Sequence, residues 1–299
     1  MALPHAPVDL FADMAAFVRA MQDELCAALE RADGAARFGR DAWDRPGGGG
    51  GVTRALQGGA LLEKAGVNVS EVQGQLDAAF ARRLPGDGTS FAAAGLSVVL
   101  HPASPYVPTA HMNVRLLRRG SRTWLGGGSD LTPCYLFDED CVHFHRTLRD
   151  AVERHLPGSY PRLKAACDAY FHLRHRGEAR GVGGVFFDDL GGDPAVELAL
   201  AKELARAFLP AWLPIAERRR GLPWGERERT WQEIRRGRYV EFNLVLDRGT
   251  AFGLETSGRT ESVLMSMPPR ARWVYAHAPE PGSPEARLLE VLRSPRGWA

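Results

Sequence analysis

The stretch Thr-Ala-His-Met-Asn-Val-Arg-Leu-Leu, residues 109–117, decides the fold of this chain. Apolar and polar side chains alternate along it, and successive side chains of a β-strand point to opposite faces of a sheet. The alternation predicts a half-buried strand whose polar face carries a histidine, an amide and a guanidinium in one row. Simple solvent exposure is the alternative for each of these three residues taken alone. The apolar positions are Ala110, Met112, Val114 and Leu116, and the polar positions are Thr109, His111, Asn113 and Arg115.

A second strand is predicted at residues 96–101, Leu-Ser-Val-Val-Leu-His, shortly before the first. The connection contains three prolines and is short enough for the two strands to pair antiparallel. We expect a register that places His101 opposite His111 and Ser97 opposite Arg115. These four side chains would then share one sheet face, which suits the wall of a ligand site better than a random surface.

Further strands and helices follow from the same patterns. Residues 238–247 alternate apolar and polar side chains and are predicted as a third strand, with short strands around 251–256, 262–267 and 272–277. Helices are predicted near residues 138–156, 160–175, 194–220 and 284–293, and from the capping Asp9 to a stop at Asp33-Gly34. The fold class is therefore α+β, with a large, mainly antiparallel sheet flanked by helices.

The length of the chain favours one domain over residues 1–299. Residues 46–51, a proline followed by five glycines, are expected to form a flexible loop within it. This run lacks the Gly-Lys-Ser/Thr that completes a phosphate-binding loop, so a linker is the better interpretation.

The composition is that of a globular protein without a strong bulk charge. Apolar residues make up 44% of the chain, and 38 basic against 36 acidic residues give a net charge of +2, which indicates neither a nucleic-acid nor a membrane-surface partner. The four cysteines are scattered and favour a reducing compartment. No signal peptide and no apolar run long enough to span a bilayer is present, so we expect a cytoplasmic protein.

Four histidines on separate predicted elements could supply imidazoles to one metal or acid/base site: His101, His111, His145 and His175. For His145, which points inward from its helix, a satisfied core position is the more common role. His175, near a helix end, could also be purely structural. A glycine-rich approach at residues 181–184 leads into a short strand that ends in Asp188 and Asp189. These carboxylates either cap the next helix or pair with Arg176 and Arg180, or one of them faces a cavity and accepts hydrogen bonds from a ligand.

Seven segments carry a resemblance to a known family. They include Gly-Leu-Ser-Val-Val-Leu-His-Pro at 95–102, Trp-Leu-Gly-Gly-Gly-Ser-Asp-Leu-Thr-Pro at 124–133 and His-Phe-His-Arg-Thr at 143–147. The others lie at residues 105–115, 174–190, 235–244 and 258–262. Together they resemble the aerobic coproporphyrinogen oxidase family, from about Gly59 to Trp298.

The resemblance implies a broad, rather flat antiparallel sheet between helical layers, a deep cleft, and a homodimer formed through residues around 239–274. It implies that coproporphyrinogen III is the substrate and that two propionates become vinyl groups, giving protoporphyrinogen IX for haem biosynthesis. Oxygen would be the co-substrate, carbon dioxide and hydrogen peroxide the further products, and neither a flavin nor a nicotinamide would take part.

The resemblance also implies roles for individual residues. His111 is similar to the family's proton donor, and Asp189, together with Asp188, is the candidate for holding the pyrrole NH groups. Arginines match the forked geometry of carboxylates, so Arg115 and Arg259 are expected to bind propionates. The adjoining substrate contacts are expected at Ser97, Asn113, Val114 and Gly258. The metal hypothesis places a divalent cation on His101, His111, His145 and His175, a ligand set that suits zinc or copper better than manganese.

Two other functions remain open from the sequence. A tetrapyrrole carrier would share the cavity and the arginines but would not need an acid/base group open to oxygen. A histidine-metal oxygenase acting on another substrate would depend on its metal for every turnover.

Overall fold

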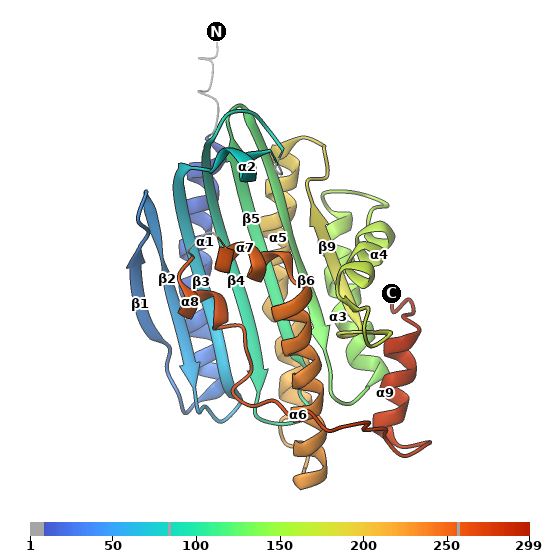
Figure 1. Cartoon of the computed structure of the whole chain (residues 1–299). Coiled ribbons are helices and arrows are strands. Elements are labelled where there is room, and N and C mark those ends of the chain that lie inside the picture. The colour runs from blue at the N-terminus through green and yellow to red at the C-terminus, as the bar shows by residue number, and fades with distance from the viewer. Residues whose placement is uncertain (1–8, 83–84, 256–257) are drawn as a thin grey trace.

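The computed structural model describes residues 9–82, 85–255 and 258–299. Its centre is a seven-stranded, flat sheet in which every neighbouring pair is antiparallel (Figure 1). The predicted fold class is confirmed. In spatial order the strands are β1 (Gly39–Asp44), β2 (Gly49–Gln57), β3 (Leu62–Gln75), β4 (Ser90–Pro102), β5 (Thr109–Arg119), β6 (Arg122–Thr132) and β9 (Gly183–Asp188).

Helices cover both faces of this sheet, and Figure 1 shows the two layers. Behind the strands lie α1 (Leu10–Asp33) and α5 (Pro194–Arg219), with α3 (Asp138–Glu153) and α4 (Tyr160–Tyr170) near β9. In front lie α6 (Glu226–Glu241), the π-helix η1 (Phe242–Leu246), α7 (Arg248–Glu255) and α8 (Thr260–Leu264). The remaining elements are α2 (Ala78–Ala81), the two-stranded β7 (His172–Leu173) and β8 (Glu178–Ala179), and α9 (Pro284–Arg293).

The predicted helices are present, and both ends of α1 follow the expected capping chemistry. The Asp9 side chain accepts a hydrogen bond from the Phe11 N–H at 3.0 Å, and Gly34 ends α1 with a φ of 79°. Glycine takes this left-handed conformation without a Cβ clash, which is why it ends so many helices. Among the described residues, no helix is long and apolar enough to cross a membrane.

The faces of β4 and β5 are as predicted, but their register is not. The apolar side chains of β5 are buried against the rear helices, while His111, Asn113 and Arg115 are half-buried on the front face. His111 lies opposite Val99, and Ser97 lies opposite Asn113, so the predicted pairing is wrong by two residues. A shift of two keeps every side chain on its face, so hydrophobic alternation selects the face without selecting among such registers.

The predicted third strand is wrong, because residues 238–247 belong to α6 and η1. Phe242 is buried, whereas Leu244 of the same apparent alternation is 51% exposed, so burial does not follow a period of two. The described parts of 251–256 and 262–267 are in or next to α7 and α8, and 272–277 has no regular structure; residue 256 lies outside the described residues.

Six of the described strands escaped prediction, namely β1, β2, β3 and β6 of the main sheet and the short β7 and β8. The glycine run is not simply a loop, because the turn ends at Gly48 and Gly49–Gly51 are already part of β2. At Gly51 a Cβ would lie 2.4 Å from the Trp43 ring and 2.3 Å from the Val69 carbonyl oxygen. Glycine here lets the indole lie directly on the sheet.

Candidate active site

A cavity of about 930 Å³ lies between the front face of the sheet and the segment from η1 to α8. Its volume is within the range of roughly 300–1,000 Å³ that is typical of sites for small organic ligands. The sheet contributes polar side chains of β3, β4 and β5, and the covering segment contributes acidic, amide and guanidinium groups. The lining includes Asn68, Ser97, His111, Asn113, Arg180, Asn243, Asp247, Gly258 and Arg259.

His111 is the first of a series of hydrogen-bonded polar groups that leads away from the cavity. Its Nδ1 lies 2.7 Å from Oδ1 of Asp130, which is directly opposite on β6. Asp130 is 2% exposed, and both of its oxygens accept from Nη2 of Arg180, at 2.9 and 2.7 Å. Nη1 of Arg180 donates to Oδ1 of Asn243 at 2.8 Å. Nε2 is therefore the ring nitrogen of His111 that has no partner among the described residues.

Electrostatics keep Asp130 ionised although it is buried. Burial alone would raise the pKa of the Asp130 carboxyl, but the charge of Arg180 and the hydrogen bonds from His111 and Arg180 more than offset this and hold that pKa below its ordinary value. The guanidinium of Arg180 lies 4.1 Å from the ring centroid of Phe171, 4.5 Å from that of Tyr239 and 4.8 Å from that of Phe242. The faces of these rings stabilise a cation that water does not reach.

Several of the predicted substrate contacts lie on the cavity wall. Ser97 and Asn113 are register partners there, and Gly258 lines the opposite side. Arg259 also lines the cavity, where one end of its guanidinium pairs with Asp41 and Nη1 is buried without a hydrogen-bond partner. A buried N–H donor without a partner is costly unless a ligand accepts from it.

Two of the predicted substrate contacts, Arg115 and Val114, do not line the cavity. Arg115 does not line the cavity itself but lies next to it, donating to Asn113 at 3.1 Å and pairing with Asp188 at 3.0 Å. Val114 is fully buried on the other face of β5, in the hydrophobic core. Its side chain therefore does not reach a ligand in the cavity, because odd and even positions of the strand face opposite ways.

The two predicted pyrrole-binding carboxylates do not line the cavity. Asp189 has a φ of 55° and its carboxylate pairs with Arg122 at 2.6 Å. Asp188 lies 3.0 Å from Arg115 and 3.5 Å from Arg248, with 30% of its side chain exposed. Pairing with arginines was one alternative from the sequence, but the expected partners, Arg176 and Arg180, pair with Glu241 and Asp130 instead. Asp247 lines the cavity instead, accepting from the Tyr170 hydroxyl at 2.8 Å.

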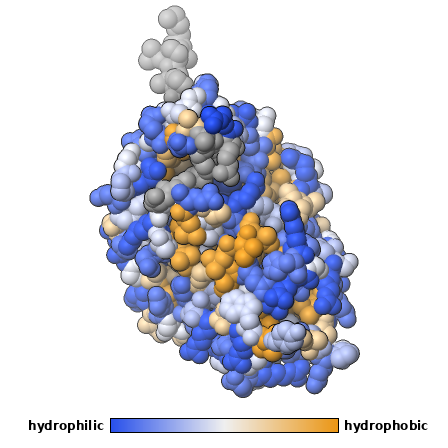
Figure 2. Space-filling model, in the orientation of Figure 1, coloured by the Kyte–Doolittle hydropathy of each residue, from blue (hydrophilic) through white to orange (hydrophobic). Residues whose placement is uncertain are grey.

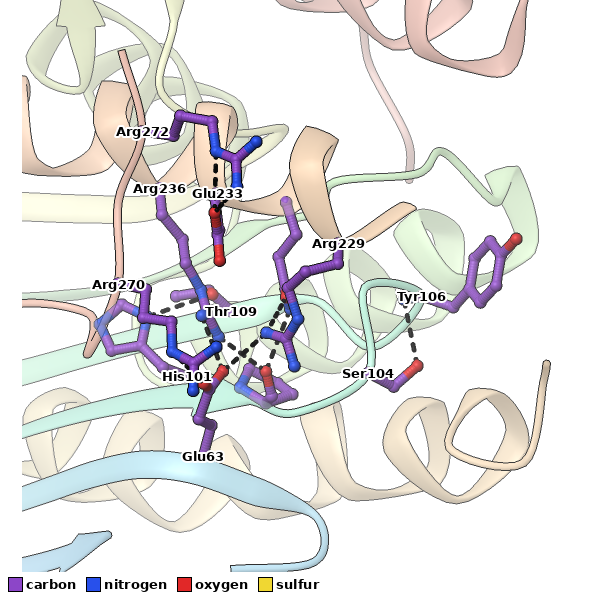
Figure 3. A network of polar contacts seen from close by, with 12 residues as sticks. Glu63, His101, Ser104, Tyr106, Thr109, Arg229, Glu233, Arg236, Arg270 and Arg272 are labelled. Carbon is purple, nitrogen blue, oxygen red and sulfur yellow. Dashed lines mark hydrogen bonds and ion pairs between the residues drawn. The ribbon is translucent and has the colours of Figure 1, made fainter. Parts of the chain in front are cut away.

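His101 is a satisfied core residue. Its Nε2 donates to the Ser266 carbonyl at 2.9 Å, so its Nδ1 is left to accept from the Thr109 hydroxyl at 3.4 Å. Burial, together with the nearby charge of Arg236, lowers the pKa of His101 to about 3. Figure 3 shows this arginine among the polar contacts around His101, directed with Arg229 and Arg270 at Glu63. This network attaches α6 to β3.

The four histidines of the metal hypothesis do not gather at one point. His145 lies on α3, where its Nε2 donates to the Val182 carbonyl at 3.1 Å and its Nδ1 accepts from the Tyr160 hydroxyl at 2.7 Å. His175 bonds to Glu241 at 2.8 Å. Within the described ranges no three His, Cys, Asp or Glu side chains are arranged to hold a metal ion. Since His101 and His145 use both ring nitrogens, the residues do not fit a shared cation, and we assign no step to one.

The sequence prediction missed the residues behind His111. Asp130, Arg180 and Asn243 are far apart in the chain and meet only in the folded protein. One signal was available, because Asp130 belongs to the Ser-Asp-Leu-Thr-Pro segment at 129–133. If that segment had been predicted as a strand that forms a β-hairpin with β5, Asp130 would have been placed opposite His111.

Comparison with known proteins gives a sequence match over nearly the whole chain. The family described as Coproporphyrinogen III oxidase matches residues 13–298. A relative from Glycine max, named oxygen-dependent coproporphyrinogen-III oxidase, chloroplastic, is 50% identical over 298 residues, which cover 94% of this chain and 77% of that relative. Because the family model spans almost the whole chain and half of the aligned residues are identical in this relative, the chain belongs to the coproporphyrinogen III oxidase family.

Proposed function

We propose that the described cavity binds coproporphyrinogen III and that His111 serves its oxygen-dependent oxidation to protoporphyrinogen IX. The observation that carries the proposal is the position of His111 on the cavity wall, with Nδ1 bound to Asp130 and Nε2 free of protein partners. An ionised carboxylate only accepts hydrogen bonds, so Nδ1 carries the proton in the neutral imidazole. Nε2 is then the atom that exchanges a proton with the substrate.

The remaining polar groups suit the outer carboxylates of the macrocycle. The unpartnered Nη1 of Arg259 is available to a propionate on one side of the cavity. Ser97 and Asn113 supply a hydroxyl and an amide on the sheet side. Arg115 lies beside Asn113 and would orient that amide through their 3.1 Å hydrogen bond.

Each oxidation converts one propionate to a vinyl group. The β-carbon loses a hydrogen with its two bonding electrons, and the bond to the carboxylate breaks, so that its electron pair forms the new double bond and carbon dioxide leaves. Oxygen accepts the two electrons and the hydrogen and, with one further proton, leaves as hydrogen peroxide. Removal of a pyrrole NH proton would make the macrocycle electron-rich enough to react with oxygen directly, without a flavin or a nicotinamide.

Incubation of the purified protein with coproporphyrinogen III, in air and without oxygen, tests this proposal. We expect loss of two carboxyl groups by mass, oxygen uptake at an electrode, and neither in anaerobic samples. His111→Gln should lower the rate by about 10²-fold or more, whereas His155→Gln, outside the cavity lining, should not. Substrate binding without oxygen uptake would indicate a carrier, and activity that disappears on chelation and returns with iron would indicate a metal oxygenase.

We also propose that the chain forms a homodimer through residues around 239–274; of these, 256–257 lie outside the described residues. Large apolar side chains are exposed here, and Figure 2 shows hydrophobic surface in this part of the front face. Large apolar side chains exposed on one face favour a protein contact. The side chains are Leu244 (51% exposed), Val245 (69%), Leu254 (44%), Trp273 (54%), Val274 (42%) and, directly after the range, Tyr275 (100%).

Sedimentation equilibrium tests the dimer. The wild type should sediment at twice the mass of one chain, and Val245→Glu should sediment as a monomer, because a carboxylate in an apolar contact lacks a partner. Val196→Glu is the matched control, since Val196 is also exposed, at 37%, but lies on α5 behind the sheet. A wild-type monomer at micromolar concentration would contradict the proposal.

A cytoplasmic location is the last part of the proposal. All four cysteines are free and buried, as expected in a reducing compartment. The Glycine max relative is described as chloroplastic, so the compartment needs its own test by imaging of a tagged chain in its host.

A further inference from the structure

We infer that Arg180 is a positioning residue for the reaction: it holds Asp130 ionised behind His111 and so fixes which nitrogen of that imidazole faces the cavity. The inference rests on the proposed role of His111. Asp130 acts on the reaction through His111 and not by touching the substrate. Both of its carboxylate oxygens are already bound, to His111 and Arg180, and its side chain is only 3% exposed.

The charge on Asp130 depends on its ion pair with Arg180. A carboxyl in a dry environment tends to take up a proton, and burial by itself pushes the pKa of Asp130 upward. The cation of Arg180, 2.7 Å away and itself 2% exposed, supplies the opposing interaction. Without this cation, we expect Asp130 to be protonated.

The charge on Asp130 determines the tautomer of His111. An ionised Asp130 accepts a hydrogen bond, so Nδ1 of His111 is the protonated nitrogen and Nε2 presents a lone pair. A protonated Asp130 would instead donate to Nδ1, and the ring proton would move to Nε2. Loss of Arg180 therefore reverses the tautomer although every atom of the histidine and the aspartate is retained.

Arg180 is held in place by hydrogen bonds and by aromatic rings around its guanidinium. Its two terminal nitrogens are bound to Asp130 and to Asn243, and three aromatic rings surround the guanidinium. A cation enclosed in this way has little freedom to turn toward the substrate. Arg180 borders the cavity, and the hydrogen bonds of its two terminal nitrogens are directed into the protein, while its Nε is buried without a partner among the described residues.

The tautomer can be measured directly. In protein labelled with ¹⁵N-histidine, the imidazole nitrogen shifts of His111 distinguish the two tautomers, and His111→Gln identifies the signal. Arg180→Gln should move the signal from the Nδ1–H to the Nε2–H pattern, and Arg180→Lys, which retains the charge, should restore it. In turnover, Arg180→Gln should lower kcat by about 10²- to 10³-fold and change KM by less than about threefold, with at least a tenfold recovery in Arg180→Lys.

Arg235→Gln is the matched control. Arg235 forms a comparable buried ion pair, with Glu178 at 2.6 Å, and borders no part of the described cavity. It should show a similar fall in melting temperature with the wild-type tautomer and kcat. The inference is overturned if Arg180→Gln keeps the Nδ1–H tautomer, or if kcat falls no further than in Arg235→Gln.

A second variant serves in case Arg180→Gln does not fold. Asn243→Ala frees one end of the guanidinium while its charge remains, and should broaden the His111 nitrogen signals through exchange between tautomers; unchanged signals would overturn the inference. The spectra need no substrate. A wild type without turnover would therefore count against the proposed function, whereas an unmoved tautomer would count against the role of Arg180.

Discussion

Three buried or half-buried histidines of this chain differ in how their ring nitrogens are used. His101 and His145 donate with one nitrogen and accept with the other, so each is a neutral part of the core. His111 uses one nitrogen and leaves the other at the cavity. An imidazole performs acid/base work only if one nitrogen remains available to the substrate, and this count singles out His111.

The unpartnered nitrogen of Arg259 leads to a prediction at the same scale. Arg259→Lys should raise KM about tenfold and leave kcat within about threefold, because lysine keeps the charge but loses the fork that matches a propionate. Initial rates over a range of coproporphyrinogen III concentrations measure this. Arg270→Lys is the control, since Arg270 is 67% exposed and lies near Glu63 outside the cavity lining. An unchanged KM in Arg259→Lys would remove the residue from the substrate site.

At the scale of elements, the helix α8 is attached to the sheet by a small group of polar side chains. The Thr53 hydroxyl lies 2.6 Å from that of Ser262 and 2.7 Å from Oδ1 of Asn68, and it accepts from the Trp43 indole at 3.1 Å. At the other end of the helix, His101 holds the Ser266 carbonyl. These bonds fix the helix that follows Arg259 against the cavity.

Removing the Thr53 hydroxyl should therefore weaken substrate binding more than chemistry. Thr53→Val keeps the shape of the side chain, and we expect a severalfold higher KM, a nearly unchanged kcat, and a loss of about 1–2 kcal/mol in the free energy of unfolding. Thr89→Val is the control, since the Thr89 hydroxyl donates to Gln75 at an exposed site. A fall in kcat with a constant KM would show that the attachment serves the chemistry instead.

Elements were predictable where burial has a single period. The strand at 109–117 alternates between core and cavity, and the rear helices carry one apolar stripe, so both were found. The segment α6–η1 is packed on several sides and carries buried arginines, which hides its helical period. The strands β1 and β2 are rich in glycine and polar residues at the sheet edge, where neither face is fully buried.

At the scale of the whole molecule, the sheet separates two tasks. The rear layer supplies most of the core, and the front layer covers the cavity with segments that have fewer apolar contacts. The part of the site on the sheet was predictable, because alternation alone puts Ser97, His111 and Asn113 on one face. The groups that tune His111 come from β6, from the stretch before β9 and from η1, and only the tertiary fold brings them together.

The buried histidines give the whole molecule a predictable response to acid. Burial lowers the pKa of His101 and of His145 from 6.5 to about 3, so the folded protein holds both neutral while the unfolded chain protonates them below pH 6.5. The unfolded state then binds more protons, and the free energy of unfolding falls as the pH decreases from 6.5 toward 3. Each histidine should contribute about 2 kcal/mol of this loss between pH 7 and pH 5.

Urea unfolding at pH 7 and pH 5 isolates this contribution, because the carboxyls whose pKa is depressed, such as Glu241 at about 2, lose their stabilising effect only below their ordinary value of 4.5. His145→Gln should be less stable than the wild type at pH 7 but should lose about 2 kcal/mol less on going to pH 5. His277→Gln, at an exposed position, should keep the wild-type pH dependence. Parallel losses in wild type and His145→Gln would mean that His145 is protonated in the folded protein, and its place in the core would then need another explanation.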